Sequence, residues 1–148
     1  MLALVMPDLE ALHMSIGAMD ALGILLGYCA YCNPDISLPE LADFISTALL
    51  GSPRLLVLGD FSMHAEVKVS GPALEFLETM ASLDISQHVK GLTHMGGHTL
   101  DLVFSTEQSE CVPMVTDLVS VPLSSSDHRL IKCNLTVALP ATERKNLF

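Results

Sequence analysis

The chain has 148 residues, of which half are hydrophobic and only 16% are charged. This length fits one domain of ordinary size, and the apolar content excludes intrinsic disorder as the main state. No apolar run reaches the roughly 18 residues that a membrane-spanning helix needs. The N-terminus lacks the basic segment of a signal peptide, so we expect an intracellular protein, nuclear or cytoplasmic, with no membrane partner.

The charge balance is strongly acidic, with seven basic residues against seventeen acidic ones and a net charge of −10. Most nucleic-acid-binding proteins carry a basic surface instead. The few basic residues of the C-terminal part are Arg129, Lys132, Arg144 and Lys145. Any role in nucleic-acid chemistry therefore has to overcome this charge, for which a bound divalent cation would compensate locally.

The N-terminal half predicts a hairpin, a helix and a buried strand. Apolar alternation in residues 9–16 and 22–28 indicates two paired strands. Ser37 is a candidate N-cap for a helix over residues 38–50. The continuous apolar run at residues 55–58, within a strand predicted at 54–58, is typical of a strand that is buried on both faces.

The second half predicts one more helix and several short strands. The helix begins at residues 71–72, and we expect Leu74, Leu77, Met80 and Ala81 to form its core face. Strands are predicted within residues 84–92 and at 99–104, 111–120 and 130–139. This order favours an α+β or α/β layered sandwich with mixed sheets over residues 1–140, followed by a tail at 141–148.

Three carboxylates and one imidazole are the candidate reactive groups. Asp60 follows the buried strand and the flexible Gly59, at a point where layered proteins often carry reactive groups. Asp101 interrupts an apolar run, so it needs a partner, and His128 is a natural one. Asp127 adjoins that histidine, and several carboxylates around one point would bind Mg²⁺. The pattern alone is also compatible with plain turns at residues 60 and 127 and a solvated edge at residue 101.

Three blocks in a fixed order carry a family resemblance. They are GDFSMH at residues 59–64, GLTH at 91–94 continuing into GHTLDLVF at 97–104, and SDH at 126–128. Together they resemble the endonuclease/exonuclease/phosphatase superfamily, in particular the endonuclease of LINE-type retrotransposons. The resemblance spans roughly residues 9 to 139. It implies an αββα four-layer sandwich of the DNase type. It also implies an enzyme that needs Mg²⁺, with Mn²⁺ as a substitute, to cleave phosphodiester or phosphomonoester bonds.

The resemblance also implies roles for individual residues. Asp60 corresponds to the carboxylate that orients or activates the attacking water, with Ser62 beside it. Asp101 corresponds to the residue that orients the catalytic histidine, and His128 to that histidine, which contacts the scissile phosphate. The metal-site carboxylate corresponds to Asp127. Tyr28 and His64 fall at positions that would contact the substrate.

The chain also departs from the family pattern. Ser62 stands where the family has Asn, and its hydroxyl lacks the amide's second polar group. The family domain is longer at its N-terminus, where its first strands supply the Glu that is the main metal ligand, and Glu10 does not fit that role. The resemblance thus implies a partial sandwich without the N-terminal strands and with weak metal binding. Such a domain would expose a sheet edge that invites self-association or a protein partner.

Two functional hypotheses follow from these observations. The first is a Mg²⁺-dependent endonuclease or phosphodiesterase acting on nucleic acid, with weakened or lost activity. The second is a catalytically dead, retrotransposon-derived fragment that acts as a protein-interaction module. The acidity, Ser62 and the absent Glu favour the second, whereas the ordered motifs favour the first.

Overall fold

The computed structural model describes residues 2–6, 9–16, 22–29, 34–63, 71–107 and 115–135. Its elements in chain order are β1 (Leu2–Met6), β2 (Leu9–Ile16), β3 (Leu22–Cys29), α1 (Pro34–Gly51), β4 (Leu55–Asp60), α2 (Pro72–Ser82), β5 (Ile85–Gln87), β6 (Asp101–Thr106), β7 (Val115–Pro122) and β8 (Arg129–Leu135). Neither helix in this described part is both long and apolar enough to cross a lipid bilayer.

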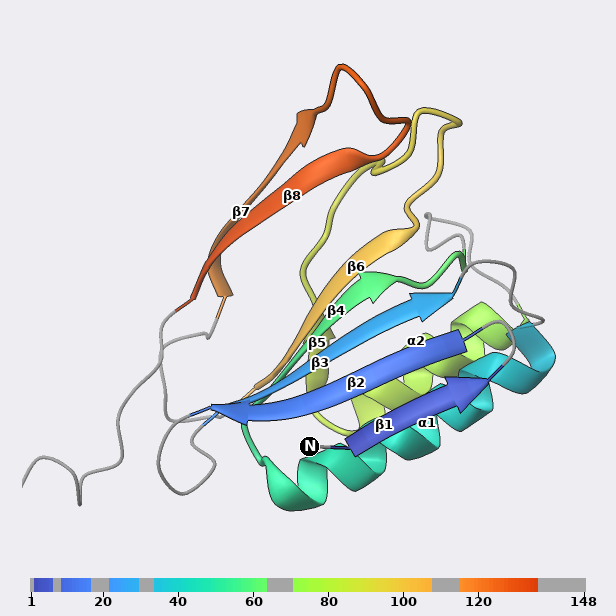
Figure 1. Cartoon of the computed structure of the whole chain (residues 1–148), viewed down its shortest axis with the longest axis vertical. Helices are drawn as coiled ribbons and strands as arrows, with labels where there is room; N and C mark the ends of the chain where they lie inside the picture. The colour runs from blue at the N-terminus through green and yellow to red at the C-terminus, as the bar shows by residue number, and fades with distance from the viewer. Residues whose placement is uncertain are drawn as a thin grey trace, which may run out of the picture.

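Six of the strands form one twisted sheet in the order β1-β2-β3-β4-β6-β5, and β7 pairs with β8 in a separate antiparallel hairpin. Strands β3 and β4 are parallel because α1 crosses over between them, whereas the other pairings are antiparallel. Both helices cover one face of the sheet, and the β7-β8 hairpin stands over the other (Figure 1). Mixed sheets and two helices confirm the predicted α+β class.

Most predicted elements are present, with shifted ends. The hairpin of β2 and β3 is confirmed, and β4, β5, β6, β7 and β8 fall on predicted strands. The pattern did not predict β1, whose five residues are too few to show a clear period. The N-cap prediction at Ser37 was wrong because α1 begins at Pro34, a residue that suits the first helical position.

The helical face of the sheet forms the main hydrophobic core. Three aromatic rings meet there: Phe61, Phe76 and Phe104 lie with their ring centroids 6.0–6.3 Å apart. The predicted core face of α2 was partly wrong, since its buried residues are Ala73, Phe76 and Met80, whereas Leu74 is 40% exposed. A face that repeats every three to four residues from position 73 leaves position 74 towards solvent.

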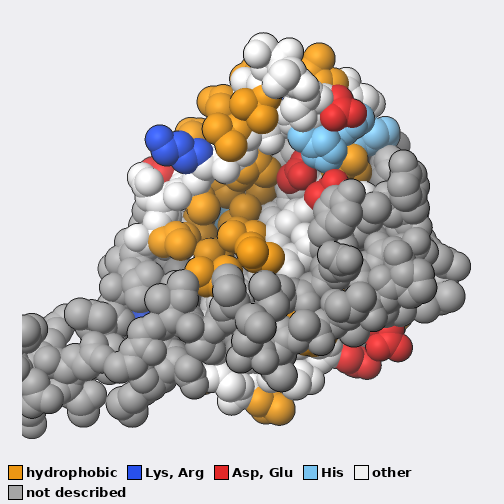
Figure 2. Space-filling view, viewed as in Figure 1, with side chains coloured by type: hydrophobic (Ala, Val, Ile, Leu, Met, Phe, Trp, Pro, Cys, Tyr) orange, Lys and Arg blue, Asp and Glu red, His pale blue; other side chains and the backbone are white. Residues whose placement is uncertain are grey.

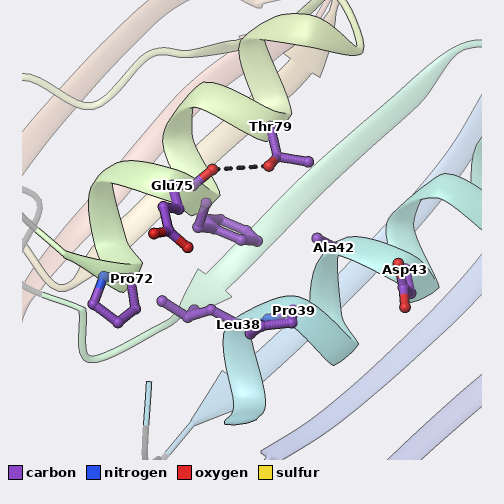
Figure 3. A pocket seen from close by; sticks show the side chains of 8 residues that line it. Leu38, Pro39, Ala42, Asp43, Pro72, Glu75 and Thr79 are labelled. Atoms are coloured by element: carbon purple, nitrogen blue, oxygen red, sulfur yellow. Dashed lines mark hydrogen bonds between the residues drawn. The ribbon is translucent and has the colours of Figure 1, made fainter. Parts of the chain in front are cut away.

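A groove of about 390 Å³ runs between the N-terminal parts of α1 and α2 (Figure 3). Its walls include Leu38 and Pro39 of α1 and Pro72 of α2, with Asp43 and Glu75 at its rim. The dashed line in Figure 3 is the hydrogen bond that Thr79 Oγ1 donates to the Glu75 carbonyl within α2. The groove lies on the helical layer, across the sheet from the candidate site.

The hairpin face of the sheet is packed more thinly. Its buried cluster consists of Leu56, Val89, Val103 and Val115. A hollow of about 350 Å³ lies between β4, β6 and β8, lined by apolar side chains such as Leu58 and Ile131 and reaching Asp60 and Asp101. Figure 2 shows this apolar hollow beside the clustered histidine and acidic side chains.

Candidate active site

Two aspartates lie opposite each other on neighbouring strands. Asp60 is the last residue of β4, Asp101 is the first of β6, and the antiparallel register pairs them directly. Side chains alternate along a strand, so each carboxylate shares the hairpin face with the apolar residue two positions away, Leu58 or Val103. Like charges directly opposite each other destabilise a sheet, so this pair needs a donor or a cation between its members.

His128, immediately before β8, supplies that donor. Its Nδ1 lies 2.8 Å from Asp101 Oδ2, and its Nε2 lies 3.8 Å from Asp60 Oδ2. The hydrogen bond with Asp101 raises the pKa of His128, partial burial opposes this, and the charges of Asp101, Asp60 and Asp127 add to the rise. The pKa of His128 therefore lies above its usual value, because two carboxylates face the ring.

A tight turn fixes Asp60. Its Oδ1 accepts hydrogen bonds from the backbone N–H of Ser62 (3.0 Å) and from the Ser62 hydroxyl (3.1 Å). Ser62 has a φ of 49°, a left-handed conformation that Asn tolerates better than Ser. The second carboxylate oxygen of Asp60 is the one that faces His128.

Two facing glycines bring β3 close to β4 at the approach to this turn. Gly27 pairs with Gly59 in the parallel register. A Cβ on Gly59 would collide with the Gly27 carbonyl, and a Cβ on Gly27 would lie 2.7 Å from the Phe61 ring. The strand end that carries Asp60 therefore depends on both glycines.

Thr93 connects the loop after β5 to the starts of β6 and β8. The side chain is fully buried, and its Oγ1 accepts the backbone N–H groups of Leu100 (2.9 Å) and Asp101 (3.0 Å). Its carbonyl accepts the N–H of Arg129 at 2.8 Å. This one residue therefore sets the position of Asp101 relative to the segment that carries His128.

The next residue of that loop, His94, lies beside Asp127. His94 Nε2 is 3.2 Å from Asp127 Oδ2, and the His94 ring meets the His128 ring edge to face at 5.0 Å. The hydrogen bond from His94 lowers the pKa of Asp127. The site is thus a row of side chains in which His128 separates the Asp60–Asp101 pair from the His94–Asp127 pair, visible as the pale blue and red cluster in Figure 2.

Comparison with protein families identifies a match over residues 25–132, to the endonuclease-reverse transcriptase family. The chain belongs to this family. The matched region is more than half of the chain and contains all four of Asp60, Asp101, Asp127 and His128. No curated protein sequence matched the chain.

Two solved structures share the fold. One is the endonuclease domain of TRAS1, a telomere-specific non-LTR retrotransposon, with a TM-score of 0.61 and 16% identity over 88% of this chain. The other is the 3′ phosphatase NExo from Neisseria bound to a product DNA hairpin, with a TM-score of 0.65 and 10% identity over 87% of this chain. The chain spans 64% and 65% of the length of these two proteins. The endonuclease-like fold expected from the motifs is thereby confirmed as a partial sandwich.

The structure describes only the backbone of one of the two predicted substrate-binding residues, Tyr28 and His64. The backbone of Tyr28 pairs with Asp60 in the β3–β4 register, but its side chain is outside the described part of the chain. His64 also lies outside the described residues. Asp101 was expected within a buried run, but it begins β6 and its side chain is 21% exposed. This position lowers the desolvation cost of its charge.

Sequence reasoning gave no role to Thr93 or His94, although both stand in the quoted loop block. The available signal was a threonine next to a histidine in a Gly-rich loop. Neither contact with the site is visible locally, because Thr93 binds Asp101, eight positions further along the chain, and His94 binds Asp127, 33 positions further along. Only the folded loop reveals them.

The donor set fits a divalent cation. Mg²⁺ prefers oxygen ligands, keeps several waters and commonly uses one or two protein carboxylates. Asp127 offers a carboxylate whose side chain is 70% exposed. Two groups of ligand atoms, Asp60–Asp101–His128 and His94–Asp127–His128, each lie within 4.8 Å of one another and share His128.

Proposed function

We propose that the chain is a divalent-metal-dependent phosphodiester hydrolase acting on nucleic acid, with Mg²⁺ as the cation and Mn²⁺ as a substitute. The observation that carries this is the contact of His128 with both Asp101 and Asp60 at one strand end of an endonuclease-family fold. We assign this role to a single domain over residues 1–140, with residues 141–148 as a tail. Its expected location is intracellular, nuclear or cytoplasmic.

Each side chain of the site has a separate role in this proposal. Asp101 accepts the Nδ1 hydrogen bond of His128, and the protonated ring donates from Nε2, on the side of Asp60, to an oxygen of the scissile phosphate. Asp60, held by Ser62, orients a water whose oxygen attacks phosphorus. One P–O bond breaks as the new one forms, the water's OH stays on phosphorus, and the leaving oxygen ends with a proton. Tyr28 and His64 are the proposed substrate contacts.

Asp127 is the proposed metal carboxylate. A bound Mg²⁺ would neutralise phosphate charge and polarise the P–O bonds. That neutralisation matters here because the chain carries a net charge of −10, which repels a polyanion in the absence of metal. Few protein ligands predict weak binding of the cation and therefore low activity.

The test is nicking of supercoiled plasmid by the purified chain, with and without Mg²⁺ or Mn²⁺. We expect slow, metal-dependent nicking that falls by about 10²–10⁴-fold in His128→Ala and is lost in Asp127→Ala. Glu78→Gln, an exposed change on α2, is the matched control and should nick like the wild type. Nicking that survives unchanged in both site variants would contradict the proposal.

A second candidate is a catalytically silent interaction module. It is favoured by the apolar hollow beside β8 and by the exposure of nearby Leu26 (42%) and Leu130 (48%). Apolar surface of this kind supports self-association. A chain that shows no metal-dependent nicking but elutes as an oligomer, and dissociates on Leu130→Asp, would favour this candidate over the hydrolase.

A further inference from the structure

His94 occupies a defined place next to the proposed metal carboxylate. It lies in the loop between β5 and β6, and its backbone pairs with that of His128 in an isolated bridge. The Met95 N–H donates to the Asp127 carbonyl at 2.8 Å, so the main chains of the two segments are tied together. The side chains then meet through His94 Nε2 and Asp127 Oδ2 at 3.2 Å.

The hydrogen bonds of His94 determine its tautomer. The backbone N–H of Gly96 donates to His94 Nδ1 at 2.9 Å, so Nδ1 accepts and carries no proton. A neutral imidazole then bears its proton on Nε2, and this N–H donates to Asp127. Gly96 is suited to this contact, because a Cβ there would lie 2.9 Å from Nδ1.

This tautomer decides between two roles for the ring. As a metal ligand, His94 would need a free lone pair on Nε2, which the Gly96 contact denies it. As a donor, it fixes one oxygen of a carboxylate whose side chain is 70% exposed and is otherwise held only by a hydrogen bond to its own backbone. The other oxygen of Asp127 is then left in a fixed direction for a cation.

We propose that His94 is a positioning residue that holds the Asp127 carboxylate in the orientation that binds the divalent cation. Its donor tautomer is set by the Gly96 amide. The inference rests on the proposed metal-dependent function, since Asp127 is the cation's ligand in that function. Removing a hydrogen-bonding partner of a metal ligand typically weakens metal affinity by about 10–100-fold.

The test is Mn²⁺ binding to the full chain, measured as free Mn²⁺ by electron paramagnetic resonance, with no substrate present. His94→Phe keeps the ring against His128 but removes both nitrogens, and we expect about 10-fold weaker binding. His94→Gln restores an N–H donor at the end of the side chain and should bind within about threefold of wild type. Gly96→Ala disturbs the tautomer and should weaken binding in the same direction as His94→Phe. Leu92→Ala, an exposed change in the same loop, should bind like the wild type.

Melting temperatures without metal should be equal among these variants, which separates positioning from a structural role. If His94→Phe binds Mn²⁺ like the wild type while Asp127→Ala loses binding, the inference is overturned and the proposed metal site stands. If Asp127→Ala also binds like the wild type, the proposed metal site itself fails. If His94→Gln and His94→Phe weaken Mn²⁺ binding equally, His94 is a direct ligand of the cation and the inference is overturned. Loss of Zn²⁺ binding in both variants would lead to the same conclusion.

Discussion

The two faces of the six-stranded sheet differ in how they are filled. The helical face is closed by α1 and α2 over the three packed phenylalanines, and its core residues are almost fully buried. The hairpin face carries a small apolar cluster, an open hollow of about 350 Å³ and, at one end, the row of aspartates and histidines. Stability therefore comes mainly from one face, whereas the candidate chemistry is placed at the edge of the other.

The difference in packing can be tested by making the same substitution, Leu to Ala, on each face and comparing the loss in the free energy of unfolding. Leu102→Ala removes a side chain that is 1% exposed in the helical core, and we expect a loss of about 2–5 kcal/mol in the free energy of unfolding. Leu130→Ala, 48% exposed near the hollow, should cost about 0.5 kcal/mol. Urea denaturation measures both. Equal losses would mean that the hairpin face is packed as tightly as the helical one.

A smaller effect is expected where the hairpin face meets the site. Thr93→Val keeps the shape of the side chain but leaves the N–H groups of Leu100 and Asp101 without their acceptor. We expect a loss of about 1–3 kcal/mol, the usual cost of stranding buried donors. Thr93→Ser retains the hydroxyl and is the control. Urea curves for Thr93→Val that overlay those of the wild type would show that this hydroxyl does not hold the loop.

The smallest predicted effect compares two histidines near opposite ends of β6. Burial lowers the pKa of His88, opposed by the charge of Glu107, and its Nε2 lies 2.6 Å from Ser105 Oγ. Its contribution to stability is therefore present above the unfolded pKa of about 6.5 and is lost as the pH falls below it. For His128, whose folded pKa is raised, the contribution is present below about 6.5 and is lost as the pH rises.

Stability measured from about pH 8 to about pH 5 tests this pair. His88→Gln should lose less stability than the wild type on acidification, and His128→Gln should lose more. The wild-type curve is the common reference for both variants. Parallel curves for all three proteins would mean that neither ring is perturbed by its place in the fold.

Much of this protein could be predicted from the sequence because the signals are local. Apolar runs marked the strands, and the blocks around Asp60, Asp101 and His128 marked both the family and the candidate residues. The errors came where several local solutions compete. Helix α1 begins at Pro34 rather than after Ser37, and α2 buries Ala73 instead of Leu74, because packing selects the start and the face.

The sequence by itself determined which side chains are available and that those at alternate positions of a strand share a face. Only the tertiary structure decided that β4 pairs with β6, which puts Asp60 opposite Asp101, and that His128, already expected as the partner of Asp101, also reaches Asp60. It alone placed His94 on Asp127 through a loop closed by Thr93. The physical reason is that strand pairing and loop closure are set by contacts between distant segments, whereas periodicity and turn chemistry report only on neighbours along the chain.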